Sequence, residues 1–117
     1  MNAYKTIDSD IEELGEVTKE QIQNLLNGLD ELDALLSEDK ICSIGLCRSE
    51  TDFMEIRPVG KSQYLIWSDR ISASKGLMGK LFGKRHIEKV VEGRAQAIEA
   101  ANFYMEHPRD EFEQKYS

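Results

Sequence analysis

Apolar residues recur at intervals of three and four between residues 19 and 36, at Ile22, Leu25, Leu26, Leu29, Leu32 and Leu36. This spacing places their side chains on one face of an α-helix. Residues 18–21 (Thr-Lys-Glu-Gln) have the form of a capping box at its start. The pattern therefore predicts a helix over 19–36. A second box at residues 9–12 (Ser-Asp-Ile-Glu) precedes a shorter apolar stripe and predicts a helix over 10–16.

The middle of the chain changes to short runs rich in branched and aromatic residues, separated by polar turns. We predict strands over 41–48, 53–57 and 63–68, and the turn chemistry between them favours a three-stranded antiparallel meander. Ile71 either prolongs the third strand or opens a short fourth. Glu55 is the one acidic residue in this predicted sheet whose setting suits a desolvated carboxyl group.

Helical spacing returns from His86 to Met105, with an apolar face made of Ile87, Val90, Val91, Ala95, Ile98, Ala101 and Met105. The residue before a proline avoids helical geometry, so this long helix should end at His107. Pro108 then suits the first turn of a short last helix. Between sheet and helix, residues 74–85 contain three glycines and predict a flexible Gly/Lys-rich loop.

Together these elements predict a single α+β domain over residues 1–117. It has N-terminal helices, a three-stranded meander, a long C-terminal helix and a short last helix. A sheet of this size buries one face best by packing helices on it, so helices 19–36 and 86–105 should share that face.

The composition narrows the class of protein. The chain carries 22 acidic and 15 basic residues, a formal charge of -7, which excludes a polybasic nucleic-acid binder as a description of the whole protein. It contains no apolar run long enough for a membrane span and no signal-peptide pattern at its start. We expect a cytoplasmic protein that does not use a membrane.

The two cysteines support a reducing compartment. Cys42 and Cys47 are five residues apart on a predicted strand, so their side chains should point to opposite faces of the sheet. That separation is too large for a disulfide bond. Two cysteines are also too few for a structural zinc site, and we expect no metal and no other cofactor.

Charge is uneven along the chain. Residues 1–40 hold 11 acidic and 3 basic side chains, whereas residues 57–94 hold 9 basic and 3 acidic ones. Four acidic residues lie off the leucine stripe of helix 19–36: Glu20, Asp30, Glu31 and Asp33. They form either a solvated face or a docking surface that steers a basic protein partner.

Motifs for catalysis are missing from the sequence. Gly79-Lys80 is followed by Leu81, and Gly83-Lys84 is followed by Arg85, so neither matches a Walker A phosphate loop. The serines have no nucleophile-elbow context. We therefore predict that the protein is not an enzyme.

Some of the same residues are candidates for binding. Near a helix N-terminus, Lys80, Lys84 and Arg85 would suit a weak anion site. Leu81 and Phe82 either pack on the sheet or form a partner-binding tip, and Tyr64 and Trp67 are either packing residues or desolvated anchors.

In size, acidic charge and organisation, the whole chain resembles the immunity proteins of bacterial toxin–immunity systems. The resemblance implies a non-catalytic protein that binds a cognate toxin and occludes its active site. Two alternatives remain at this point. One is a phage-type inhibitor whose acidic residues mimic nucleic acid in the groove of a host defence nuclease. The other is an anion- or nucleic-acid-binding module that uses the basic 57–94 region.

Overall fold

The computed structural model describes residues 1–8, 10–36, 40–49, 51–70 and 86–116. In chain order its elements are β1 (Asn2–Ile7), β2 (Asp10–Glu16), α1 (Lys19–Leu35), β3 (Cys42–Ser49), β4 (Asp52–Gly60), β5 (Gln63–Arg70), β6 (Ile87–Glu92), α3 (Arg94–Glu106) and α4 (Arg109–Tyr116). The six strands form one antiparallel sheet in the order β2-β1-β3-β4-β5-β6. The sheet therefore has β2 and β6 at its edges.

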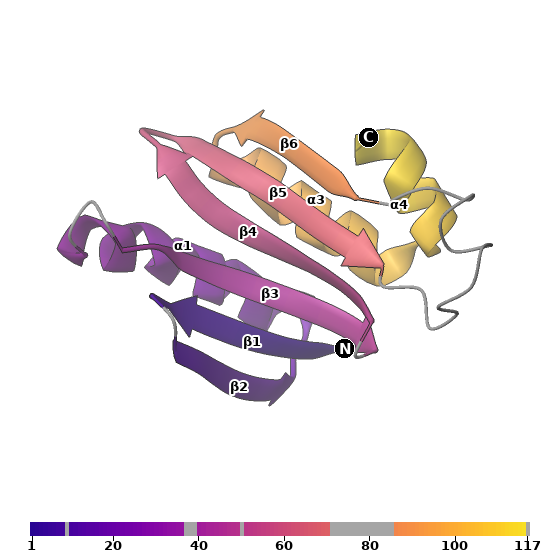
Figure 1. Cartoon of the computed structure of the whole chain (residues 1–117), viewed down its shortest axis with the longest axis horizontal. Helices are drawn as coiled ribbons and strands as arrows, with labels where there is room; N and C mark the ends of the chain where they lie inside the picture. Colours follow the sequence, from indigo (N-terminus) through magenta and orange to yellow (C-terminus); the bar gives the residue numbers. More distant parts are fainter. Residues whose placement is uncertain (9, 37–39, 50, 71–85, 117) are drawn as a thin grey trace, which may run out of the picture.

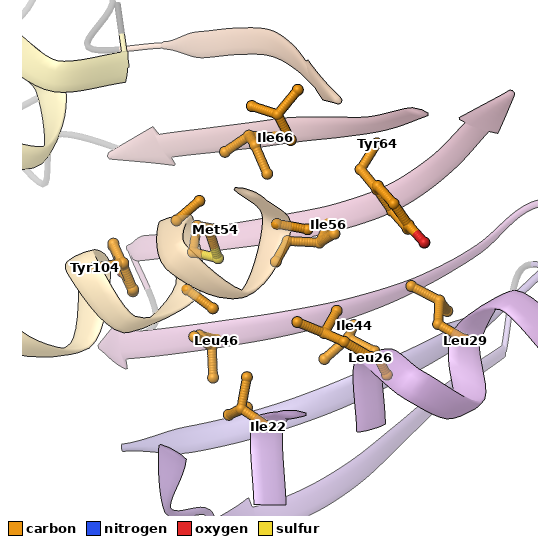
Figure 2. Close-up of a cluster of buried hydrophobic side chains, with 14 of the residues drawn as sticks. Ile22, Leu26, Leu29, Ile44, Leu46, Met54, Ile56, Tyr64, Ile66 and Tyr104 are labelled. Atoms are coloured by element: carbon orange, nitrogen blue, oxygen red, sulfur yellow. The ribbon is translucent and has the colours of Figure 1, made fainter. Parts of the chain in front are cut away.

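Helices α1 and α3 lie side by side on one face of the sheet, and α4 lies against β6 and α3 (Figure 1). The core fills the space between this helix layer and the sheet. Figure 2 shows Ile22, Leu26 and Leu29 of α1 pointing toward the buried side chains of the central strands. The strand residues that face the helices are Ala3, Cys42, Ile44, Leu46, Met54, Ile56, Tyr64, Ile66, Ser68, Ile87 and Val91.

The predicted helix over 10–16 is wrong, because this segment is strand β2. It pairs with β1 as a hairpin, and Asp8 turns the chain between them with a φ of 57°. An isolated segment of seven residues with few apolar side chains gains little as a helix. Pairing with β1 satisfies its backbone groups instead. Strand β1 itself was not predicted.

The predicted long helix over 86–105 is also wrong in its first part. Residues 87–92 form the edge strand β6, and the helix begins only after Gly93, whose φ is 81°. Ile87 and Val91 fit both periods, since residues four apart share a face in a helix and also in a strand. The branched side chains favour a strand over residues 87–92, and the glycine that follows ends this strand before the helix begins.

These differences overturn the predicted fold of N-terminal helices and a three-stranded meander, because the sheet has six strands and the chain begins with two of them. The predicted strands 41–48, 53–57 and 63–68 correspond to β3, β4 and β5 at its centre. The predicted helix 19–36 is α1, with the capping box at Thr18 and Gln21 formed. A short last helix follows Pro108 as α4. Ile71 and the predicted loop 74–85 lie outside the described residues.

Candidate binding face

The second face of the sheet is covered by none of the helices that the structure describes, and Figure 1 views the molecule from this side. Side chains alternate between the two faces of a strand. Tyr4, Gly45, Glu55, Trp67 and Glu88 are cross-strand partners from β1 to β6, and they all belong to this open face. We call it the open face below.

A groove of about 600 Å³ crosses the open face over β1 to β5. Its lining combines aromatic, aliphatic and acidic side chains. They are Asn2, Ala3, Tyr4, Ile11, Glu13, Gly15, Cys47, Ser49, Phe53, Glu55 and Trp67. Because these residues come from five strands, only the assembled sheet creates the groove.

Gly45 allows the ring of Tyr4 to lie flat on the sheet. A Cβ atom at position 45 would stand 2.1 Å from the Cζ atom of Tyr4, closer than any real contact. The two residues are direct cross-strand partners, and an aromatic ring over a strand glycine covers backbone that would otherwise be exposed. The missing side chain at Gly45 therefore lets the Tyr4 ring form the floor of the groove.

Glu55 is an acidic residue buried in this floor, with 7% of its surface exposed. Its Oε1 atom accepts a hydrogen bond from the Tyr4 hydroxyl at 2.9 Å, and its Oε2 atom accepts one from Arg57 Nη2 at 3.0 Å. Burial and the Glu55 carboxylate raise the pKa of Tyr4 well above its usual range. Both oxygens of Glu55 are therefore bonded within the protein.

Aromatic side chains form the other half of the groove. The ring of Phe53 lies 5.2 Å from that of Trp67, centroid to centroid, and the guanidinium of Arg57 lies 5.4 Å from the Trp67 ring. His86 meets the same indole edge-on at 5.8 Å and forms an ion pair with Glu88 when it is protonated. Trp67, the only tryptophan of the chain, is half-buried here.

The two cysteines lie on opposite faces of β3, as predicted, and both are free thiols. Cys42 faces the helix layer, where burial and then Asp33 raise its pKa to about 11. Cys47 lines the groove, and its thiol contacts the carbonyl of Asn2. Burial and then Glu13 raise the pKa of Cys47, while the amino group of Met1 acts more weakly in the opposite sense.

The acidic residues predicted on α1 divide into two groups. Glu20 and Glu31 are exposed. Asp30 accepts hydrogen bonds from Tyr64 at 2.5 Å and from Arg94 at 3.1 Å, so it joins the helix to β5 and α3. Asp33 is half-buried next to Cys42. Two of the four predicted residues therefore bond or pack within the protein.

The other predicted site residues are also scattered. Tyr64 is 3% exposed and points toward the helix layer, as Figure 2 shows, so it offers no surface to a partner. Trp67 lies on the opposite face, in the groove. Lys80, Leu81, Phe82, Lys84 and Arg85 lie outside the described residues. From the basic 57–94 region, Arg57 and Arg94 are each paired with an acidic residue, Glu55 and Asp30.

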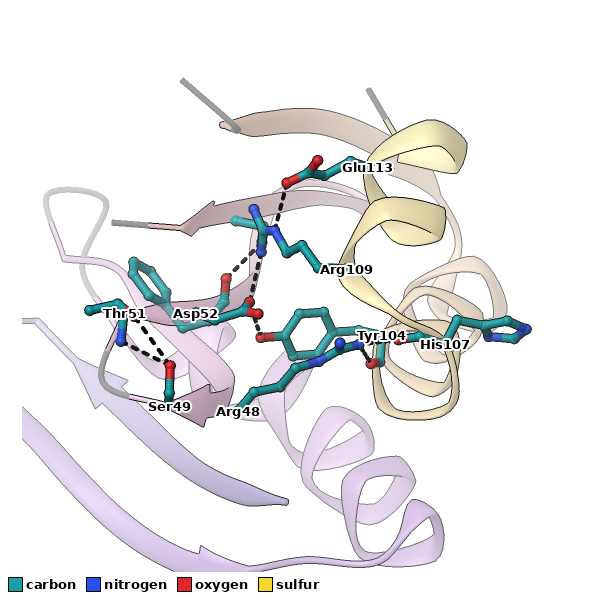
Figure 3. Close-up of polar contacts among 10 residues, drawn as sticks. Arg48, Ser49, Thr51, Asp52, Tyr104, His107, Arg109 and Glu113 are labelled. Carbon is teal, nitrogen blue, oxygen red and sulfur yellow. Dashed lines mark hydrogen bonds and ion pairs between the residues drawn. The ribbon is translucent and has the colours of Figure 1, made fainter. Parts of the chain in front are cut away.

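A second polar cluster lies between the sheet and the C-terminal helices (Figure 3). Arg109 is 5% exposed and binds Asp52 Oδ1 at 3.0 Å, Glu113 Oε1 at 2.9 Å and Ser68 Oγ at 2.7 Å. The Tyr104 hydroxyl donates to the same Asp52 oxygen at 2.7 Å. This network holds α3 and α4 against the ends of β4 and β5, a structural role.

All four tyrosines have a raised pKa because each is partly or fully buried, so the fold favours their neutral form. A raised folded pKa adds stability below the unfolded value near 10, and this stability disappears as the pH rises beyond it. We expect phenolate absorbance to stay flat through pH 10 and then rise together with loss of the circular-dichroism signal. A smooth titration near pH 10 in the intact fold would contradict this burial.

Within the described ranges no group of three His, Cys, Asp or Glu side chains is placed to hold a metal ion. In the same part of the chain, no helix has the length and apolarity needed to cross a membrane.

Sequence reasoning found Trp67, singled out Glu55 and marked Gly45 as a site of close packing or a bulge, but it missed Tyr4 and Glu13, because they meet only through the β1–β2 hairpin. The available signal was the group of aromatic and β-branched residues Tyr4, Thr6 and Ile7, which favour a strand. No family model, curated protein or solved structure matches this chain.

Proposed function

We propose that this is a non-catalytic binding protein that inhibits a basic protein partner by covering its active site, as toxin immunity proteins do. The open face is its contact surface. The observation that carries the proposal is the groove on a sheet face that no described helix covers, lined by Trp67, Phe53 and Tyr4. Aromatic side chains in such hollows are common anchors of protein–protein interfaces.

Exposed apolar residues extend this surface to both edge strands of the sheet. Ile11 on β2 is 69% exposed and Val90 on β6 is 52% exposed, and both belong to the open face by strand pairing. Exposed apolar side chains on both edge strands, together with an aromatic-lined groove, are typical of a surface that a partner covers. The open face therefore suits a partner that buries it from β2 to β6.

The polar groups of the groove favour binding over catalysis. Both oxygens of Glu55 are already bonded to Tyr4 and Arg57. The Cys47 thiol has a raised pKa, which lowers its thiolate fraction and thus its nucleophilicity. An acid–base or nucleophilic mechanism needs a group that is free to exchange a proton or attack a substrate.

The charge beside the groove favours a basic partner. Residues 2–16 of the β1–β2 hairpin contain five acidic side chains and one basic one. Like charges gathered at one side of an interface speed the encounter with an oppositely charged protein and reject acidic ones. A cytoplasmic site of action would fit this role, since the two thiols are free.

The proposal is tested by co-expressing the protein with the product of its neighbouring gene and measuring the affinity of the purified pair. Ile11→Arg places a bulky cation in the groove at an exposed position, so the fold should tolerate it. We expect affinity to fall by about thirtyfold or more, the effect of losing an interface hot spot.

Leu35→Arg is the matched control, because Leu35 is 84% exposed on α1, in the helix layer. It should bind like the unchanged protein. If Leu35→Arg lost binding while Ile11→Arg bound normally, the partner would contact the helix layer and not the open face. If the product of the neighbouring gene neither binds this protein nor is inhibited by it, the proposed immunity function is wrong.

A further inference from the structure

We infer that the groove holds an arginine side chain of the partner, with its guanidinium bonded to Glu13 and stacked on the ring of Tyr4. This inference rests on the proposed function and names the chemistry of the partner's anchor. It follows from the charges and the aromatic rings of the open face.

Glu13 carries the uncompensated charge of the groove. Glu55 is neutralised by Arg57, whereas among the described residues no hydrogen bond or ion pair joins the Glu13 side chain to another side chain. Strand pairing puts Glu13 directly opposite Tyr4, on the groove side of β2. A cation that enters the groove therefore meets a free carboxylate beside an aromatic ring.

The aromatic side chains favour arginine over lysine. A planar guanidinium stacks on aromatic rings and binds a carboxylate through two parallel hydrogen bonds. Arg57 already shows this packing, with its guanidinium over Trp67 while it donates to Glu55. A partner arginine bonded to Glu13 and stacked on the exposed surface of Tyr4, its cross-strand neighbour, would repeat the same arrangement on the solvent side.

Polar atoms next to the groove also lack partners. Among the described residues, buried side-chain atoms without a hydrogen bond include Thr6 Oγ1, Ser43 Oγ and Arg57 Nε. Thr6 and Ser43 are cross-strand partners, and Ser43 and Arg57 flank the paired Ile44 and Ile56, so the three share one row of the open face. Buried polar groups are normally paired. Because these three atoms are buried within the protein, a partner cannot bond to them directly, and the contacts available to it are Glu13 and the aromatic rings of the groove.

Two other occupants fit less well. A second copy of this chain carries the same charge of -7 and would bring Glu13 against like charge. A partner strand added to the edge of β2 would meet the bulge between Ala3 and Tyr4 and a row of exposed acids, which are features that block edge pairing.

The test uses Trp67 as the reporter, because it is the only tryptophan and lines the groove. The probe is the peptide acetyl-Gly-Arg-Leu-Arg-Gly-amide, compared with the same peptide carrying citrulline in place of both arginines. We expect the arginine peptide alone to change Trp67 fluorescence saturably and with a strong dependence on salt. Glu13→Gln should weaken this binding about tenfold, as expected for the loss of one charge-assisted hydrogen bond.

Glu12→Gln is the matched control, since Glu12 is the next residue on β2 and points to the other face with the same charge. It should bind the peptide like the unchanged protein. Equal binding of the citrulline peptide, or equal weakening by Glu12→Gln and Glu13→Gln, would overturn the inference. If neither peptide binds but Ile11→Arg still abolishes partner binding, the arginine anchor is wrong and the proposed function stands.

Discussion

Replacing Gly45 with alanine should destabilise the protein by about 1–3 kcal/mol, the usual cost of forcing an extra group into packed structure. The new Cβ would lie 2.1 Å from the Tyr4 ring, so the ring must leave the floor of the groove. Its hydrogen bond to Glu55 then breaks, and the buried carboxylate loses one of its two partners. Urea unfolding measures the loss of stability, and Trp67 fluorescence reports the altered groove.

Gly28→Ala is the control for this prediction. Gly28 lies exposed in α1 with no atom within 4 Å of an added Cβ, so alanine should stabilise the helix by about 1 kcal/mol. The same chemical change thus has opposite signs at the two positions. A Gly45→Ala protein as stable as the parent, with unchanged Trp67 fluorescence, would show that the Tyr4 ring does not rest on Gly45.

Arg109→Met should cost about 3–5 kcal/mol, the range for breaking a buried ion pair and leaving its partner uncompensated. Asp52 would keep only its hydrogen bond from Tyr104, while Ser68 and Glu113 would each lose the guanidinium. Helix α4 would lose the bonds through which Arg109 attaches it to β4 and β5, while Tyr104 and Arg48 would still join α3 to the sheet. Chemical denaturation monitored by circular dichroism measures the effect.

Lys115→Gln provides the comparison. Lys115 binds Glu99 at 2.9 Å on the surface of the same two helices, and exposed pairs contribute about 1 kcal/mol or less. If Arg109→Met destabilised the protein no more than Lys115→Gln does, the buried network of Figure 3 would have no special role in holding the helices.

The elements predicted well are those whose own sequence decides their structure. Helix α1 combines a long apolar stripe with a capping box, and the central strands combine branched residues with turn signals. The segments 10–16 and 86–92 were assigned to helices because short apolar spacings of three and four fit either structure. Only pairing with β1 and β5 makes them strands, and such long-range pairing leaves little trace in local sequence.

The candidate site was hard to predict for the same reason. Tyr4, Gly45 and Glu55 are far apart in the chain and become neighbours only when β1 inserts between β2 and β3. The acidic residues of α1 suggested a binding site on its surface. Asp30, however, accepts hydrogen bonds from Tyr64 and Arg94 within the protein. Charge patterns show where acids are concentrated, but they do not show which ones remain free for a partner.

The most direct test of the binding face is the alkylation rate of Cys47 in the free protein and in complex with its partner. Cys47 lines the groove, whereas Cys42 is buried on the other face and serves as an internal control. Complex formation should slow iodoacetamide labelling of Cys47 about tenfold or more, because reaction requires access to the thiol. Cys42 should stay unreactive in both states. An unchanged Cys47 rate in a saturated complex would contradict binding through the open face.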